Sequence, residues 1–138
     1  MSATHFQSPI QRILREAFDK GNLTVVDEVL SSDYIVHNSK NRLVNNYDEI
    51  KRLISTFRIA FPDLQTIVED EIQEGEKVVA RWTMSGTHKG LLMGITPTGK
   101  SMKIQGVFFA RLADGMIQDY WILIDQYGML QQLGIIPG

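Results

Sequence analysis

The sequence predicts an α+β domain in which N-terminal helices precede a curved antiparallel sheet that wraps an apolar pocket. A chain of 138 residues suits one domain, because single cores commonly organise about 100–150 residues. Up to residue 61 apolar side chains recur at helical spacing, whereas from residue 64 onward β-branched and aromatic runs alternate with turn residues. Helices followed by a meander of strands indicate the α+β class. We therefore expect one domain over residues 1–138, with residues 1–8 flexible.

Three helices are predicted in the first half of the chain. Ser8 and Gln11 have the spacing of a capping box in front of an apolar stripe. Asn22 can cap a second, shorter helix. Asn46 can cap a third, which ends before Pro62 because the residue preceding a proline avoids helical angles. The predicted helices span 9–20, 23–30 and 46–61, with a short extended segment at 34–37 between the last two.

Four strands and a closing helical turn are predicted in the second half. Glycines at the turns after residues 74 and 114 indicate hairpins, and the connection 88–99 is an unusually apolar loop that should cover part of the core. Gly134 and Pro137 end a last helical turn over 125–133. The predicted strands span 64–72, 77–87, 101–112 and 116–124.

Composition excludes several classes of function. A formal net charge of -2 gives no basic surface for a phosphate backbone, so we expect no nucleic-acid partner. No apolar stretch approaches the roughly 20 residues that span a bilayer, and no secretory signal opens the chain, so we expect no membrane partner and a cytoplasmic protein. The absence of cysteine removes thiolate chemistry, and three scattered histidines do not predict a metal site.

The last predicted strand carries carboxylates among large apolar residues. Charged carboxylates in a dry core are costly unless they are paired, solvated or functional, and a pocket wall would satisfy this requirement. Trp82, in another predicted strand, and Trp121 are the candidate aromatic walls. If the last strand has no bulge, the side chains that point to one side are Ile117, Asp119, Trp121, Leu123 and Asp125.

Several short motifs follow one another in an order that resembles the SnoaL-like polyketide cyclases, a family of the nuclear transport factor and ketosteroid isomerase-like superfamily. The resemblance covers about residues 10–134 and implies a cone-shaped sheet. The motifs are Asp33-Tyr34-Ile35-Val36-His37, Ala60-Phe61-Pro62-Asp63-Leu64, Arg81-Trp82-Thr83, Gly86-Thr87-His88-Lys89-Gly90, Gly94-Ile95-Thr96-Pro97-Thr98-Gly99-Lys100, Ala113-Asp114-Gly115-Met116-Ile117 and Leu130-Gln131-Gln132-Leu133-Gly134.

The resemblance implies a cofactor-free intramolecular aldol ring closure on a small apolar, polyketide-like carbonyl substrate. Asp125 matches the position of the aspartate that acts first as base and then as acid, a role that suits a carboxyl in an apolar pocket. His37 could assist from the opposite wall, which makes Asp125 and His37 the predicted catalytic residues. No metal or other cofactor is implied. The predicted substrate-binding residues are Trp82, Trp121, Gln105, Asn38, His88, Asp119 and Phe61.

Alternative interpretations remain open for these residues. Asp125 could simply cap the final helix, Asp119 could pair with Arg81 or Arg111, and His37 and His88 could be structural. An epoxide hydrolase would instead need Arg111 to bridge Asp119 and Asp125 inside the pocket. The third hypothesis is a non-catalytic protein that binds small molecules.

A homodimer or higher homo-oligomer is the last prediction. Val107, Phe109, Ile122 and Ile124 have the opposite parity from the proposed pocket line and are apolar. A second apolar side of a sheet is commonly buried by self-association through a two-fold axis. The alternative is that a bulge exchanges the two parities, so that these residues fill the core.

Overall fold

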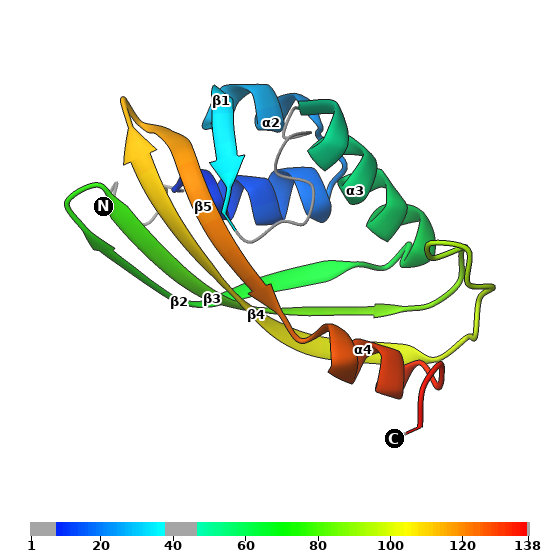
Figure 1. The fold of residues 1–138 in the computed structure, drawn as a ribbon. Coiled ribbons are helices and arrows are strands. Elements are labelled where there is room, and N and C mark those ends of the chain that lie inside the picture. Colours follow the sequence, from blue (N-terminus) through cyan, green and yellow to red (C-terminus); the bar gives the residue numbers. More distant parts are fainter. Residues whose placement is uncertain (1–7, 38–46, 138) are drawn as a thin grey trace.

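The computed structural model describes residues 8–37 and 47–137 and shows an open, curved five-stranded sheet with helices on its concave side (Figure 1). This arrangement confirms the predicted α+β class. Ser8, which we expected in a flexible segment, is buried and caps the first helix. The elements are α1 (Pro9–Arg12), η2 (Ile13–Phe18), α2 (Thr24–Val29), β1 (Leu30–Val36), α3 (Tyr47–Ala60), β2 (Gln65–Glu74), β3 (Lys77–Thr87), β4 (Ser101–Ala113), β5 (Met116–Ile124) and α4 (Gln126–Gln132).

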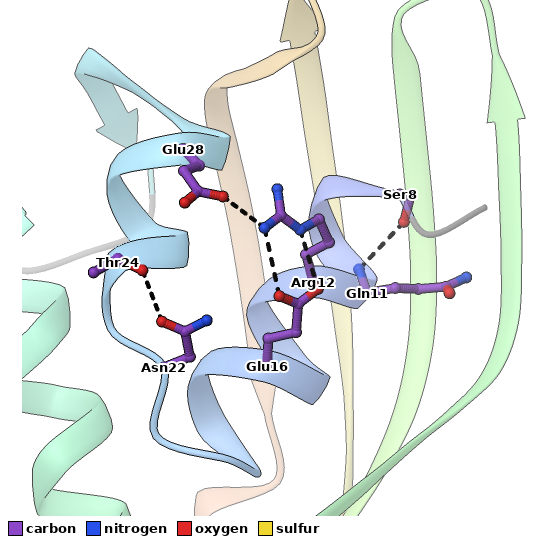
Figure 2. A network of polar contacts seen from close by, with 7 residues as sticks. All are labelled: Ser8, Gln11, Arg12, Glu16, Asn22, Thr24 and Glu28. Atoms are coloured by element: carbon purple, nitrogen blue, oxygen red, sulfur yellow. Dashed lines mark hydrogen bonds and ion pairs between the residues drawn. The ribbon is translucent and has the colours of Figure 1, made fainter. Parts of the chain in front are cut away.

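The first predicted helix forms, but it continues as a π-helix from residue 13. Ser8 Oγ accepts a hydrogen bond from the Gln11 backbone N–H at 3.2 Å, as the capping box predicts. The second half of the box is absent, because the Gln11 side chain donates to Glu71 on β2 instead. Figure 2 shows Arg12 between Glu16 and Glu28: its ion pair with Glu16 lies within the first helix, and its ion pair with Glu28 ties this helix to α2.

The sheet order is β1-β5-β4-β3-β2, and the four strands from β2 to β5 are antiparallel. The expectation of a wholly antiparallel sheet is wrong for β1, which begins earlier than predicted and pairs parallel to β5. The chain reaches β1 directly from α2 and then leaves into the segment before α3, so β1 adds to the sheet edge beside a strand that lies 80 or more residues later. Propensity and alternation carry no signal for such a distant partner.

The register assigns the side chains of the central strands to two sides of the sheet. Trp82, Gly106 and Ile124 lie opposite one another on the side that packs against the helices, which we call the helix-facing side. Arg81, Val107 and Leu123 share the other side, which we call the outer side. The buried hydrophobic residues of the helix-facing side and of the helices form one core cluster.

A bulge in β5 divides the line of side chains that the sequence predicts. Asp119 pairs with Arg111 and Ile117 pairs with Leu112, so Gln118 is an extra residue between them. Ile117 is therefore completely buried on the helix-facing side, whereas Asp119 lies on the outer side. The prediction that both point the same way is wrong, because it assumed a regular strand.

Helix α4 covers the part of β4 that β5 does not reach. Met129 and Leu133 are buried, and the side-chain amide of Gln132 accepts from Lys103 N–H at 2.6 Å and donates to Lys103 O at 3.0 Å. This amide replaces the strand neighbour that β4 lacks at Lys103. Leu92 of the 88–99 loop is buried, as expected of a covering loop. Within residues 8–37 and 47–137, no helix combines the length and apolar character that a membrane crossing requires.

Candidate functional site

The structure separates the two predicted aromatic walls. Trp82 lies on β3 and faces the helices with 1% of its surface exposed, whereas Trp121 lies on β5 on the outer side. Because they lie on opposite sides of the sheet, the two indoles cannot line one pocket. Phe61 is on the same side as Trp82 and is fully buried against Gly86. This separation follows from the register of three strands and from the bulge at Gln118. Hydrophobic alternation in the sequence predicts neither of them.

Three predicted site residues meet on the outer side. His37, at the end of β1, places Nε2 2.8 Å from Asp119 Oδ2 and stacks on Trp121 with ring centroids 4.1 Å apart. Arg111 lies over the same indole at 5.5 Å, and Phe109 meets its edge at 5.3 Å. The predicted pairing of Asp119 with an arginine therefore involves Arg111. Trp121 is covered by His37, Phe109 and Arg111, so its ring is not an open stacking surface.

The contact between Asp119 and Arg111 is electrostatic rather than a formed hydrogen bond. Arg111 Nε lies 3.3 Å from Asp119 Oδ1, within ion-pair distance. The guanidinium N–H is nevertheless not directed at this oxygen, which is buried and accepts no hydrogen bond among the described residues. The hydrogen bond to His37 is consequently the better-formed contact of this carboxylate, and it holds the imidazole against Trp121.

Asp125 stands at the other end of β5. Its Oδ1 accepts a hydrogen bond from Gly128 N–H at 2.9 Å, so the predicted capping role is formed. The side chain is exposed and borders an open depression of about 270 Å³ on the outer side. Gln105 contributes an amide to the same depression. The remaining lining residues are Arg81, Gly106, Val107, Leu123 and Ile124.

The structure does not bring His37 and Asp125 together. His37 contacts Asp119, and Asp125 lies six positions after Asp119 along an extended chain, which corresponds to roughly 20 Å. The prediction that His37 assists Asp125 from an opposite wall is therefore wrong. An epoxide-hydrolase arrangement is contradicted for the same reason: Arg111 pairs with Asp119 on the outer side and cannot also bridge to Asp125.

His88 is held by its own loop. Its Nδ1 accepts a hydrogen bond from Thr98 N–H at 3.2 Å, and its backbone bonds to Lys100 and Gly99. Because Nδ1 is an acceptor, the neutral ring carries its proton on Nε2. These hydrogen bonds favour the structural interpretation of His88. Asn38, a predicted carbonyl ligand, lies outside the described residues.

A tyrosine cluster on the helix-facing side was not singled out by sequence reasoning. Tyr34 stacks with Tyr47 and with Tyr120 at 6.2 Å each, and Phe108 lies 4.6 Å from Tyr120. Burial raises the pKa of Tyr34 to about 12 and raises the pKa of Tyr120 further, so both phenols stay protonated at neutral pH. The three tyrosines are 13 and 73 residues apart in sequence, and only the pairing of β1 with β5 could have indicated the cluster.

The described residues contain no cluster of three or more histidine or acidic side chains that could hold a metal ion. The chemistry that their arrangement supports is proton transfer and hydrogen bonding by carboxylate, imidazole, amide and phenol groups. These groups are divided between the two sides of the sheet. The carboxylate and imidazole groups of the central strands and of the end of β1 lie on the outer side, and the buried phenols lie on the helix-facing side.

Comparisons with known proteins agree with this fold. The chain is 30% identical to nogalonic acid methyl ester cyclase from Streptomyces nogalater over 120 residues, which are 86% of this chain and 90% of that protein. It is 27% identical over 134 residues to aklanonic acid methyl ester cyclase DnrD from Streptomyces peucetius, covering 93% of this chain and 90% of the relative. TsrD from Streptomyces laurentii superposes with a TM-score of 0.81 at 26% identity, and 93% of each chain is covered.

IdmH from Streptomyces antibioticus superposes with a TM-score of 0.76 at 28% identity, covering 93% of this chain and 99% of that one. The family model described as SnoaL-like polyketide cyclase matches residues 8–133, which is most of the chain. The prediction of a cyclase-type enzyme rested on the order of short motifs along this same region. The chain belongs to the SnoaL-like polyketide cyclase family, and the match confirms that prediction.

Proposed function

We propose that this protein is a cofactor-independent cyclase that closes a ring within a small, apolar, carbonyl-bearing substrate of the polyketide ester class, with Asp125 as the acid/base group. Its relatives in the family include two methyl ester cyclases. The observation that carries the assignment is the position of Asp125, an exposed carboxylate beside apolar Val107 and Leu123. Its Oδ1 is occupied by the Gly128 cap, whereas Oδ2 accepts no hydrogen bond among the described residues.

The chemistry needs one proton acceptor and one oxyanion partner. Asp125 Oδ2 removes a proton from the carbon next to a carbonyl, the resulting enolate carbon attacks a second carbonyl of the same molecule, and the new alkoxide takes the proton back. Atoms and charge balance, and the product is an isomer of the substrate. Gln105 and Arg81 border the depression and can donate hydrogen bonds to the oxygen on which negative charge develops.

The depression is open, and ring closure requires that water be kept from the enolate. Its volume of about 270 Å³ is slightly below the roughly 300–1,000 Å³ of small-molecule pockets. We propose that a second copy of the chain covers it by packing on the outer apolar patch, which consists of Val107, Phe109, Trp121 and Leu123. Leu123 is 66% exposed, so this patch is available for association.

The composition of this patch corrects one prediction. Val107 and Phe109 lie on the outer side as expected, but Ile122 and Ile124 lie opposite Phe108 and Gly106 on the helix-facing side. The reason is again the bulge in β5, which exchanges the parity of the segment after it. The outer side of β5 instead carries Leu123, which is 66% exposed, and Trp121, which is partly covered by His37, Phe109 and Arg111.

The dimer is expected to show in solution as a mass of twice the 15.7 kDa chain. Phe109→Glu places a charge in the middle of the outer apolar patch, so the mass should fall to that of one chain and turnover should fall with it. Multi-angle light scattering at micromolar concentration measures the first effect. Lys77→Glu on the same side of the sheet is the matched control and should keep the doubled mass. A wild-type mass of one chain would contradict the proposal.

A non-catalytic binding protein is the second candidate, and one observation favours it. The exposed Asp125 is already used as a cap, and the helix-facing positions of β3, β4 and β5 carry no carboxylate or imidazole. A binding protein of this kind would hold its ligand without converting it. The two candidates are separated by whether a carbonyl ester substrate is consumed.

The direct test is incubation of the purified protein, without added cofactor, with nogalonic acid methyl ester and aklanonic acid methyl ester. A cyclase should produce a compound of identical mass and altered ultraviolet absorbance, because ring closure isomerises the substrate. Liquid chromatography with mass detection follows the conversion against a buffer blank and heat-inactivated protein. Saturable binding of both esters without conversion above the blank would support the binding protein instead.

A further inference from the structure

The loop between β3 and β4 contains a tight two-residue turn. Leu92 N–H donates to Ile95 O at 3.0 Å, and Ile95 N–H donates to Leu92 O at 2.8 Å. Met93 and Gly94 between them have φ angles of 45° and 87°, and two consecutive positive values are characteristic of a type I′ turn. Leu92 is completely buried and anchors the turn in the core.

The base of this loop is fixed to the rest of the fold. Gly99 N–H donates to His88 O at 2.9 Å, which closes the loop on itself, and Gly90 N–H donates to Ala60 O at 3.2 Å, at the end of α3. Gly90 fits there because it has no side chain: an added Cβ would be 2.0 Å from Ile59 O. The loop therefore docks on α3, and it projects at the end of the sheet opposite the two hairpins (Figure 1).

This fixed loop exposes large apolar side chains. Leu91 is 56% exposed and Met93 is 60% exposed, one on each side of the buried Leu92. Ile59, in the last turn of α3 and in contact with Gly90, is 62% exposed. Single exposed hydrophobic residues are ordinary, but three that lie together on a projecting turn form a patch that marks an interaction site. We call Ile59, Leu91 and Met93 the apolar tip.

Basic residues flank the apolar tip. Lys89 and Lys100 lie at the two ends of the loop and are exposed. From residue 77 to residue 113 the chain carries six lysine and arginine residues and no aspartate or glutamate. Asp63, which follows α3, accepts hydrogen bonds from Thr87 at both carboxylate oxygens and is thereby held against β3. An anionic surface that met the tip would therefore meet lysine side chains.

An aliphatic tip flanked by lysines favours a lipid surface over a protein partner. Protein interfaces are enriched in aromatic side chains and arginine and depleted in lysine, whereas the loop 88–99 has no phenylalanine, tyrosine, tryptophan or arginine. Peripheral membrane proteins insert apolar side chains roughly 5–10 Å into the boundary between headgroups and acyl chains, and nearby lysines bind anionic headgroups. The expectation of no membrane partner rested on the lack of a spanning stretch, which surface docking does not require.

We propose that the apolar tip docks on an anionic bilayer surface, with Ile59, Leu91 and Met93 among the headgroups and Lys89 and Lys100 against the lipid phosphates. The tip is separate from the outer apolar patch and from the depression at Asp125, and the proposal does not depend on turnover.

Flotation of the full chain with vesicles tests this docking. Vesicles of phosphatidylcholine and phosphatidylglycerol in equal parts should carry the protein upward at about 0.1 M salt, and pure phosphatidylcholine vesicles should bind it at least about fivefold more weakly. Raising the salt to about 1 M should weaken binding to the anionic vesicles, because the Debye length falls from about 10 Å to about 3 Å.

The double variant Leu91→Ser/Met93→Asn tests the apolar contribution. Asparagine accepts the positive φ of residue 93, so the turn is kept. Affinity for anionic vesicles should fall roughly tenfold or more, because two large apolar side chains no longer leave water on binding. Ile72→Ser is the matched control: Ile72 is 69% exposed but lies near the β2–β3 hairpin, so binding should stay within about twofold. Circular dichroism verifies that each variant is folded.

Lys89→Gln tests the electrostatic contribution. Affinity for anionic vesicles should fall roughly fivefold, the effect of one lysine at a charged membrane, while affinity for neutral vesicles should not change. Lys77→Gln makes the same change of net charge at the other end of β3 and should have less than half of this effect. Equal effects of the two lysine variants, or a double variant that binds like wild type, would overturn the proposal. A wild-type chain that does not float with anionic vesicles would also overturn it, and an acidic protein would then be the partner to test.

Discussion

Asp125→Asn is expected to lower the rate of ring closure by about 100-fold or more while leaving the free energy of unfolding within about 0.5 kcal/mol of wild type. Asparagine caps helices as well as aspartate does, so the hydrogen bond from Gly128 N–H is kept. Its amide cannot take a proton, and a lost general base typically costs 10²- to 10⁴-fold. Initial rates and chemical denaturation of the same preparations measure the two quantities.

Two further variants separate catalysis from capping. Asp125→Ala removes both functions and should add a stability loss of about 1 kcal/mol to the loss of turnover. Asp119→Asn is the matched control, since it makes the same chemical change in the other outer-side carboxylate of β5 and should leave turnover nearly unchanged. If Asp119→Asn abolished turnover and Asp125→Asn did not, proton transfer would belong to the pair of Asp119 and His37, 2.8 Å apart.

The elements of the fold could be predicted because each has a local cause. The apolar stripe after Ser8 gives the first helix, and the proline at residue 62 ends α3 where the pattern says it should. Gly75 and Gly115 have φ angles of 60° and 78° and form the two hairpin turns that the sequence indicates. The motifs that indicate the family follow one another along these elements and the loops between them, so the fold class and the family could be predicted together.

The composition of the site could not be predicted, because it depends on one extra residue and one distant pairing. Gln118 lengthens β5 by one position, which moves Ile117 and Asp119 to opposite sides of the sheet. His37 meets Asp119 across 82 positions because β1 joins the edge of β5. Sequence reasoning selected His37 and Asp119 as site residues but not their contact. Alternation along a strand assigns side chains to a side of the sheet only as far as the next bulge.

Asp125 illustrates a different limit. The capping and acid/base interpretations use the same side chain: the sequence Asp125-Gln126-Tyr127-Gly128 indicates the cap, and the family resemblance implies the acid/base role. The structure shows that the cap engages one carboxylate oxygen, so the two roles are compatible. Whether Asp125 acts as the acid/base group then depends on how far its side chain is exposed to water. A carboxylate needs an apolar and dry environment to act as a base near neutral pH. We propose that a second copy of the chain supplies that environment, and the pattern of a single chain does not indicate it.

The largest effect on stability is expected at Gly106, where the fold depends on the absence of a methyl group. An alanine Cβ would lie 2.2 Å from Trp82 Cζ2 and 2.7 Å from Cε2, distances that van der Waals repulsion forbids. β4 is paired on both sides at this point, with Trp82 and with Ile124, so neither backbone nor ring can move away cheaply. Gly106→Ala should therefore lower the free energy of unfolding by at least about 1–3 kcal/mol, the usual cost of overpacking a core.

A double-mutant cycle with Trp82→Phe identifies the cause of this loss. Phenylalanine lacks the part of the indole that lies on Gly106, so Gly106→Ala should cost less than half as much in the Trp82→Phe background, with a coupling energy above about 1 kcal/mol. Urea denaturation of the four proteins measures the cycle. Gln105→Ala, at the next and exposed position of β4, is the control and should change stability by less than about 0.5 kcal/mol. Additive effects within that margin would mean that the indole does not occupy the space above Gly106.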